Sequence, residues 1–286
     1  MKLHCAGRIL DLAEPVVMGV LNVTPNSFSD GGRVTRLDAA LAQGLAMQAA
    51  GAAILDIGGE STRPGADPVP LQEELDRVIP IIERLRRETD AVLSIDTMKP
   101  GVMLEAVAAG AGLVNDVMGL QAPGALEAVA GTDAAVCVMH MQGEPRTMQQ
   151  APLYDDVLAE VANFLQSRAS ACLAAGIAAD RICVDPGFGF GKSLDHNLEL
   201  LAGLSVITAG PWPVLVGLSR KSMLGALLGR AVDERLAGSL ALATASVLAG
   251  ARIIRAHDVR ETHDAVRVAT AIARKRGVAG NKESKA

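Results

Sequence analysis

Short apolar runs recur eight times along the chain, and each ends in residues that can hydrogen-bond, carry charge or hold a metal. A strand that is buried on both faces has this kind of unbroken apolar sequence. The runs are 16–22, 52–62, 92–97, 113–117, 134–140, 181–187, 214–221 and 252–258. Their polar residues are Asn22, Asp56, Glu60, Thr62, Asp96, Asn115, Asp116, His140, Asp185, Ser219, Lys221, Arg255 and His257. If the eight strands run parallel, these groups meet at one rim, which is the arrangement typical of an enzyme.

Segments with a helical period lie between the runs. Thr35 and Asp38 form a variant of a capping box before the first of them, and Pro80 predicts either a kink or two short helices in the second. This alternation favours a single closed (β/α)8 barrel, a TIM barrel, over a doubly wound open sheet, which stays the rival. Helices are predicted at 37–50, 71–87, from Pro100 onward, and at 154–175, 194–206, 222–228, 236–249 and 259–276.

The two ends of the chain complete the predicted architecture. The first 14 residues predict a short β-hairpin at the bottom of the barrel. We assign residues 1–278 to one barrel domain and expect 279–286 to be a disordered tail.

Composition and charge narrow the class of protein. Half of the 286 residues are apolar, which is enough for a large core. The net charge of −5 argues against a general nucleic-acid or anionic-membrane surface, so neither partner is expected. The start has no continuous apolar stretch and does not resemble a signal peptide. The longest uncharged segment, 236–251, is shorter than the roughly 20 residues that a membrane span needs.

The four cysteines point to a reducing, cytoplasmic location. Cys5, Cys137, Cys172 and Cys183 form no C-x-x-C pair, and two of them lie inside apolar runs. Buried, reduced thiols are therefore expected.

Two motifs resemble known signatures without fulfilling them. The sequence PGFGFGKS at 186–193 nearly spells a phosphate-binding P-loop, but Pro186 stands where that motif requires glycine. Asn22-Val23-Thr24 matches a glycosylation sequon, which carries no meaning without a secretory signal.

Aromatic residues are concentrated in the loops that follow the runs. Of only four phenylalanines, Phe28, Phe188 and Phe190 lie in Gly-rich loops at the expected rim. We expect them to form flat walls for a planar ring, although ordinary loop packing is the alternative.

These same segments resemble one known family over nearly the whole chain, the dihydropteroate synthases. The match includes GVLNVTPNSFSDGG, DIGGESTRPGA, SIDTMKP, NDVMG, MHMQGEPRTMQ, DPGFGFGK, GLSRKSMLG and IIRAHDV, in order and at fitting spacing. One departure is Asn26, where the family usually has Asp. The resemblance implies an enzyme of folate biosynthesis. Such an enzyme joins p-aminobenzoate to 6-hydroxymethyl-7,8-dihydropterin pyrophosphate and releases pyrophosphate.

The resemblance also implies where the pterin and its diphosphate bind. Asp96, Asn115 and Asp185 match pterin-binding positions, with Lys221 near the reacting centre and Met139 against the ring; a helix N-cap is the alternative role for each Asp. The diphosphate is expected to bind Arg63, Arg255 and His257, together with a Mg²⁺ ion held in part by Asn22. His140 has no assigned ligand, and core support is at least as plausible for it.

For p-aminobenzoate the resemblance implies a planar slot and an anion site. Thr62, Pro64 and Phe190 match the slot, Ser222 opens a helix whose free N–H groups suit a carboxylate, and Phe28 and Asp30 belong to a loop that closes over it. The resemblance also implies a target of the sulfonamide drugs, with the degree of susceptibility depending on the loops after the first two strands, and a homodimer is the expected assembly.

No obligatory nucleophile is evident, so we predict a dissociative (SN1-like) reaction with catalytic roles for Asp96, Asp185, Lys221, Arg255 and His257. Other classes stay open: a pterin-binding methyltransferase, a Schiff-base aldolase barrel, or a silent pterin-binding protein. The Arg-x-His pair at 255–257 and the STRPGA loop argue against the first. Asp185, where a Schiff-base lysine would stand, argues against the second.

Overall fold

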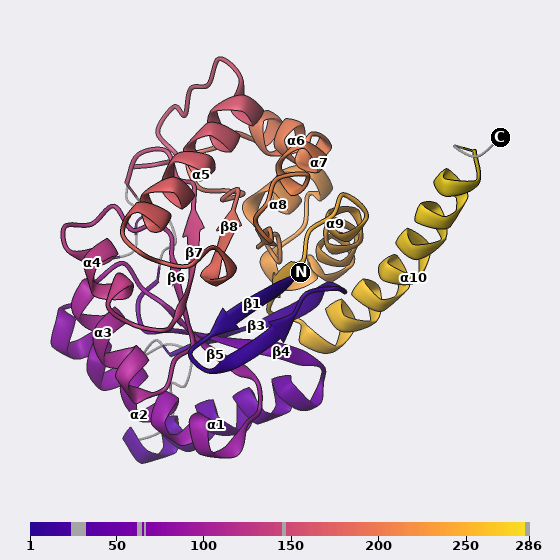
Figure 1. The fold of residues 1–286 in the computed structure, drawn as a ribbon. Coiled ribbons are helices and arrows are strands. Elements are labelled where there is room, and N and C mark those ends of the chain that lie inside the picture. Colours follow the sequence, from indigo (N-terminus) through magenta and orange to yellow (C-terminus); the bar gives the residue numbers. More distant parts are fainter. Residues whose placement is uncertain (24–32, 62–64, 66, 145–146, 284–286) are drawn as a thin grey trace.

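The chain forms a closed barrel of parallel strands inside a ring of helices (Figure 1). The computed structural model describes residues 1–23, 33–61, 65, 67–144 and 147–283, and only the backbone of 33–36 and 276–283. The large sheet has the strand order β8-β7-β6-β5-β4-β3-β10-β9, with every neighbouring pair parallel. A parallel bridge between Val184 and Val214 closes it. The predicted (β/α)8 barrel is confirmed, and the open-sheet alternative is wrong.

Each of the eight predicted runs contains one strand. Two strands end well before their runs, because β4 stops at a glycine pair and β9 pairs with β10 over only two residues. Glu60, Ser219 and Lys221 therefore lie in the connections that follow the strands. The strands are β3 (Val16–Asn22), β4 (Ala52–Gly58), β5 (Val92–Asp96), β6 (Leu113–Asp116), β7 (Ala135–Met139), β8 (Ile182–Asp185), β9 (Leu215–Val216) and β10 (Ile253–Ala256).

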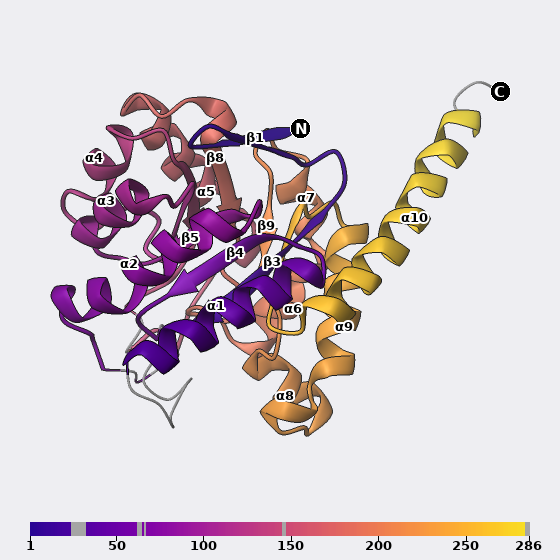
Figure 2. The ribbon, with the colours of Figure 1, turned by 90° about the horizontal axis from the view of Figure 1, so that it is seen from below.

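The predicted hairpin closes the N-terminal end of the barrel. Strands β1 (Lys2–Cys5) and β2 (Arg8–Asp11) pair antiparallel through the Ala6-Gly7 turn, whose two residues both have positive φ. Its buried side chains, Leu3 and Leu10 among them, pack on the barrel interior in a cluster that includes Met18 and Ile54. Figure 2 shows the hairpin at one end of the barrel and α8 at the other. The open rim is thus the C-terminal one.

The helices cover the outer face of the barrel, where the larger apolar cluster lies. Short α4 was not predicted, because six residues are too few to show a helical period. The helices are α1 (Arg33–Ala49), α2 (Leu71–Glu88), α3 (Pro100–Ala109), α4 (Ala125–Ala130), α5 (Val157–Ala174), α6 (Leu194–Ala202), α7 (Leu204–Thr208), α8 (Ser222–Leu228), α9 (Leu236–Leu248) and α10 (Val259–Glu283), with 3-10 turns η2 (Ala179–Arg181) and η3 (Val232–Glu234).

Several predicted helix boundaries need correction. Helix α1 begins four residues before the predicted start, so Thr35 lies inside it and is not its cap. Helix α2 is one helix that contains Pro80; the prediction of two short helices is wrong, because its buried face (Val78, Ile82) continues across the proline. The segment 194–206 instead divides into α6 and α7 at Gly203.

The C-terminal helix is longer than predicted. Helix α10 continues through Glu283, five residues into the segment 279–286 that we expected to be disordered, since extending a formed helix is much easier than starting one. Residues 284–286 lie outside the described residues, and the single-domain assignment stays a prediction. The end of α10 projects beyond the body of the barrel (Figures 1 and 2).

Two predictions from composition can also be compared with the structure. Cys5, Cys137, Cys172 and Cys183 are all buried free thiols, as expected. Among the described residues, no helix combines the length and apolar character required to cross a bilayer.

Candidate active site

Arg255 lies at the centre of a charged cluster at the C-terminal rim. Its Nε donates to Asp56 Oδ2 at 2.6 Å, and its Nη2 donates to Asp96 Oδ2 at 2.7 Å. Arg255 is on β10, and β3 and β4 separate that strand from β5, which carries Asp96. The guanidinium therefore reaches Asp96 across the barrel interior. We call Asp56, Asp96 and Arg255 the inner cluster.

Asp56 is the most connected member of the inner cluster, although sequence reasoning gave it no role. It is fully buried, and it also accepts hydrogen bonds from Ser94 Oγ at 2.6 Å and Asn115 Nδ2 at 3.2 Å. A buried carboxylate requires such partners. A lone Asp inside an apolar strand is the sequence signal that could have identified it.

The inner cluster shifts the acid–base properties of its members. Burial raises the pKa of Asp96 to about 7; Arg255 opposes this, and the nearby Asp56 carboxylate adds to it. Burial acts to lower the pKa of Arg255, but the ion pairs with Asp56 and Asp96 outweigh it and raise that pKa above its ordinary value. The guanidinium stays charged at any working pH.

Two further charged residues, Asp185 and Lys221, lie at the same rim and attract each other electrostatically. Asp185 ends β8 and accepts a hydrogen bond from Gly187 N–H at 2.7 Å; burial raises its pKa. Lys221 donates to the Phe188 carbonyl at 2.7 Å, and its Nζ lies 4.0 Å from the centre of the Phe190 ring. Burial lowers the pKa of Lys221 to about 8, against the attraction of Asp185. The ammonium is thus present at neutral pH but is lost in mild alkali.

Residues 186–192, which we call the Gly-Phe loop, connect β8 to α6. The loop takes a shape that only glycine permits at Gly187, which has φ +68° and where an added Cβ would lie 1.8 Å from the His140 carbonyl oxygen. Lys192, the lysine of the near-P-loop sequence, is buried and donates to His140 Nδ1 at 2.9 Å. It points into its own loop, in keeping with our rejection of a P-loop.

His140 supports the site from the core. Its ring is buried and packs edge-on against Phe164 at 4.9 Å between centres. Burial, then the charge of Lys192, lowers the pKa of His140 to about 3, so it is neutral and can accept from the Lys192 ammonium. His140 could have been a ligand-binding residue or a supporting residue of the core, and its burial and contacts favour the second role.

The expectation that three phenylalanines wall a planar slot is wrong for one of them and stays a prediction for the other two. Phe188 is 1% exposed and belongs to the core, so its assignment to the slot is wrong. The alternating left-handed glycines of the Gly-Phe loop direct neighbouring side chains differently, which sequence spacing does not reveal. Phe190 is half-buried beneath Lys221.

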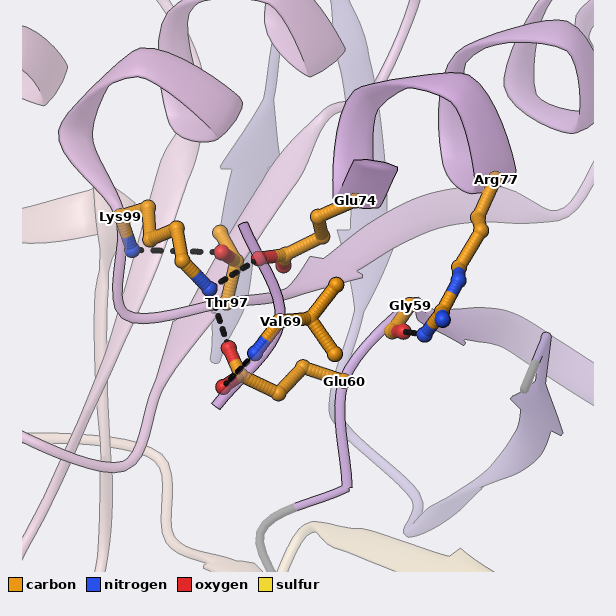
Figure 3. A network of polar contacts seen from close by, with 7 residues as sticks. All are labelled: Gly59, Glu60, Val69, Glu74, Arg77, Thr97 and Lys99. Carbon is orange, nitrogen blue, oxygen red and sulfur yellow. Dashed lines mark hydrogen bonds and ion pairs between the residues drawn. The ribbon is translucent and has the colours of Figure 1, made fainter. Parts of the chain in front are cut away.

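A second cluster of the same composition lies outside the barrel (Figure 3). Lys99 Nζ donates to Glu60 and, at 2.6 Å, to Glu74 Oε2 on α2. Glu60 Oε1 also accepts from Val69 N–H at 3.0 Å, across the two ends of the connection between β4 and α2. We call Glu60, Glu74 and Lys99 the outer cluster.

Comparisons with known proteins agree with this geometry. A family model described as "Pterin binding enzyme" matches residues 18–257. The chain belongs to this family of pterin-binding enzymes. It is 52% identical to the dihydropteroate synthase of Escherichia coli K12 over 95% of this chain and 96% of that protein, and 50% identical to that of Haemophilus influenzae over 94% and 98%.

Solved structures give the same result for the pterin-binding barrel. The Yersinia pestis dihydropteroate synthase in a sulfonamide drug complex superposes with a TM-score of 0.90 at 52% identity, covering 95% of this chain and 99% of that one. The Xanthomonas albilineans enzyme in complex with 7,8-dihydropteroate gives 0.84 at 48% identity, covering 95% and 98%.

Most residues predicted to bind substrate lie together at the rim. Asn115 and Met139 are buried at the ends of their strands, and Met139 pairs in register with Asp185. His257 follows β10, and its Nδ1 lies 3.1 Å from Ser219 Oγ. Ser222 is exposed at the first position of α8.

The remaining predicted residues lie outside the described part of the chain. They are Phe28, Asp30, Thr62, Arg63 and Pro64, and Asn26, the departure from the family, lies there too. Their assigned roles in loop closure and in binding stay predictions.

Proposed function

We propose that this chain catalyses the dihydropteroate synthase reaction of folate biosynthesis. It condenses 6-hydroxymethyl-7,8-dihydropterin pyrophosphate with p-aminobenzoate, giving 7,8-dihydropteroate and pyrophosphate. The observation that carries the proposal is the convergence of Asp96, Asn115, Asp185, Lys221 and Arg255 at one rim of a barrel whose 52% identical relative is a dihydropteroate synthase.

The pterin takes the centre of the rim. Its pyrimidinone edge presents both donors and acceptors, which carboxylates and carboxamides pair. In this proposal Asp96, Asn115 and Asp185 bind that edge, Lys221 donates to the ring, and Met139 packs on its face. The support is that all five are buried or half-buried and lie on four strand ends and the turn after β9.

The diphosphate lies between β3, β4 and β10 in this proposal. Arg255 offers a planar fork suited to phosphate oxygens, with His257 beside it and Arg63 from the connection after β4. Arg255 keeps its charge because Asp56 and Asp96 stabilise it. The guanidinium is therefore a permanent cation next to the leaving group.

Mg²⁺ is the proposed cofactor, and the donor atoms present suit it. Asn22 Oδ1 and Asp96 Oδ2 each lie 3.8 Å from where a Cβ on Gly58 would be, so two hard oxygen donors flank bare backbone. Among the described residues there is no group of three or more metal-binding side chains. Mg²⁺ commonly takes only one or two protein ligands and completes its shell with water and phosphate. When bound with the diphosphate, it neutralises the leaving group's charge.

The p-aminobenzoate site is assigned to the outer part of the rim. Phe190 and Pro64 form its planar slot, Thr62 lies near the amine, and Ser222 receives the carboxylate. Phe28 and Asp30 belong to the loop that closes over it. Because the sulfonamides mimic p-aminobenzoate in shape and charge, we propose that they bind here too.

The proposed chemistry is dissociative. The bond from the pterin methylene carbon to the diphosphate oxygen breaks, and its electron pair leaves with pyrophosphate. The resulting cation is delocalised into the pterin ring, where the carboxylates of Asp96 and Asp185 stabilise it. The amine lone pair of p-aminobenzoate then forms the new C–N bond, and the nitrogen releases a proton. A carbon isotope effect typical of concerted attack would contradict this route.

The decisive experiment is a coupling assay. The protein is incubated with the pterin pyrophosphate, labelled p-aminobenzoate and Mg²⁺, and the products are separated. We expect labelled 7,8-dihydropteroate and stoichiometric pyrophosphate. If neither forms, the proposed function is wrong.

The proposed assembly is a cytoplasmic homodimer without nucleic-acid or membrane partners. Exposed apolar side chains on α9 and α10, such as Leu236, Val268 and Ile272, offer a surface for a second copy. Sedimentation equilibrium at micromolar concentration tests this assembly.

A further inference from the structure

The Gly-Phe loop is held by side chains rather than by a backbone ladder. Five consecutive backbone carbonyls, those of residues 187–191, each accept a hydrogen bond from a side chain. Lys192 serves two of them, and one residue serves each of the others. The donors are Lys192 to residues 187 and 190, Lys221 to 188, Gln149 to 189 and Tyr154 to 191.

Lys192 is the internal support of this loop. Its Nζ lies 2.9 Å from the Gly187 carbonyl, 3.2 Å from the Phe190 carbonyl and 2.9 Å from His140 Nδ1. An ammonium group has three N–H donors on one atom, and here each has an acceptor. The side chain is 2% exposed, so no donor is left for a substrate. A buried amino group whose donors all have acceptors fixes those acceptors in space, because losing any of them leaves a buried donor unsatisfied. Burial lowers the pKa of Lys192 to about 7, so all three donors are present in the protonated form.

The two carbonyls that Lys192 holds bracket the one that Lys221 uses. Gly187 and Phe190 are held from the core side, and the Phe188 carbonyl between them accepts from Lys221 at 2.7 Å. The same arrangement brings the Phe190 ring under the Lys221 ammonium, 4.0 Å from its centre. The position of Lys221 is thus defined by the loop conformation that Lys192 maintains.

We propose that Lys192 is a positioning residue that acts through Lys221, holding the Gly-Phe loop so that its Phe188 carbonyl and Phe190 ring orient the Lys221 ammonium toward the pterin. The inference rests on the proposed function, since it deepens the role assigned there to Lys221. It gives a purpose to the lysine of the near-P-loop sequence, which the reaction itself does not use.

A double-mutant cycle tests the proposal. Lys192→Met keeps the unbranched apolar stem of the side chain and removes the terminal amino group with its three donors. We expect it to lower kcat/KM for the pterin pyrophosphate ~10-fold in the wild-type background, since small displacements of a catalytic group have effects of this size or larger. In a Lys221→Met background the same change should cost less than about twofold, because its route to the substrate is already gone. Equal losses in both backgrounds would overturn the proposal.

Tyr154→Phe is the matched control. It removes the donor to Gly191, a carbonyl of the same loop that does not neighbour the one used by Lys221. Its effect should be the same with and without Lys221. If Tyr154→Phe couples to Lys221→Met as strongly as Lys192→Met does, the effect is general to the loop and the specific role of Lys192 is wrong.

Two further measurements keep the proposal testable under other outcomes. If Lys192→Met does not fold, the same support can be weakened through His140. His140→Leu removes the acceptor for Lys192, whereas His140→Asn retains one. Only His140→Leu should lose activity, and only in the background that contains Lys221. The second measurement is the equilibrium affinity for 6-hydroxymethylpterin in the wild type, the two single variants and the double variant, which requires no turnover. An inactive wild-type protein would therefore contradict the proposed function, whereas additive losses in binding would contradict this inference alone.

Discussion

The inner and outer clusters have the same composition and different positions. Each combines two carboxylates with one cation, and each draws residues from β4, β5 or the turns that follow them. The side-chain exposures nearly match: 0%, 11% and 22% for Asp56, Asp96 and Arg255, and 0%, 8% and 25% for Glu74, Glu60 and Lys99. Neither charge balance nor burial distinguishes them.

The side of the barrel wall distinguishes them. Arg255 reaches Asp96 across the barrel interior, so the inner cluster faces the space where parallel barrels bind their ligands. Lys99 instead joins Glu60 to Glu74 on α2, outside the barrel (Figure 3). A buried ion-pair network is therefore a functional candidate only when its strand positions point inward; otherwise it fixes how a helix and a connection pack.

The largest contrast should come from removing the two cations. Arg255→Met should lower kcat/KM for the pterin pyrophosphate by about 10²–10³-fold, the usual cost of losing a group that stabilises developing negative charge. Binding of free 6-hydroxymethylpterin should weaken far less. Lys99→Met should leave kcat within about threefold and lower Tm by a few degrees, because a paired buried charge loses its partner.

Steady-state kinetics, calorimetric pterin binding and thermal unfolding measure these effects. Arg84→Met, which breaks an exposed pair with Glu88 on α2, is the control for losing a cation and should change none of them. Equal loss of diphosphate use and free-pterin binding in Arg255→Met would show that its assigned role is wrong.

The fold could be predicted from sequence because the barrel repeats one simple pattern. Eight apolar runs separated by helical segments leave little choice of architecture, and each run contains a strand. The ends of helices were harder to predict where a single residue such as proline or glycine gave a local signal that tertiary contacts modified. Pro80 is tolerated inside α2 because the buried face extends past it. The predicted helix 194–206 divides at Gly203, a position that has no room for a side chain, since an added Cβ would lie 2.5 Å from Leu158.

A smaller contrast should come from the fully buried carboxylate of each cluster. Asp56→Asn and Glu74→Gln each remove one negative charge and preserve shape, and each leaves one carboxylate for the cation. Asp56→Asn should lower kcat/KM about 10- to 100-fold, since the neutral amide can no longer hold Arg255 by charge. Glu74→Gln should leave kcat/KM within about threefold of the wild-type value. Its change in Tm should be comparable to that of Asp56→Asn.

The same kinetic and unfolding assays apply to this pair. Similar activity losses in both variants, at similar Tm, would remove the distinction between the clusters. A large loss of kcat/KM in Glu74→Gln alone would indicate that the outer cluster, and not the inner one, takes part in the reaction.

The site was less accessible from sequence than the fold. Strand ends that carry a polar residue were found readily, as Asp96, Asn115, Asp185 and Arg255 demonstrate. Asp56 received no role because it lies two residues inside its strand, and only the three-dimensional structure shows three donors meeting at it. Phe188 was misassigned because alternating positive-φ glycines reverse side-chain direction without a sequence signal.

The smallest expected effect is the dependence of activity on pH. It distinguishes Asp96, in the inner cluster, from Lys221, in the turn after β9. Asp96, with its pKa raised to about 7, must be ionised to stabilise the pterin cation, so activity should fall as pH drops through that value. Lys221, with its pKa lowered to about 8, must be protonated, so activity should fall again as pH rises through about 8. The expected profile of kcat/KM is bell-shaped with a narrow maximum.

Lys221→Arg sharpens the assignment of the alkaline limb. A guanidinium with a pKa above 12 keeps its charge across the working range, so the limb near pH 8 should disappear while the acid limb remains. The maximum should fall only about tenfold, since the charge is kept but the fit to the Phe188 carbonyl is not. The measurement is kcat/KM from pH 5.5 to 9.5, with Tm recorded at each pH to exclude unfolding. If the limb near pH 8 persists, it belongs to another group; Lys192, whose pKa burial lowers to about 7, is then the one to test.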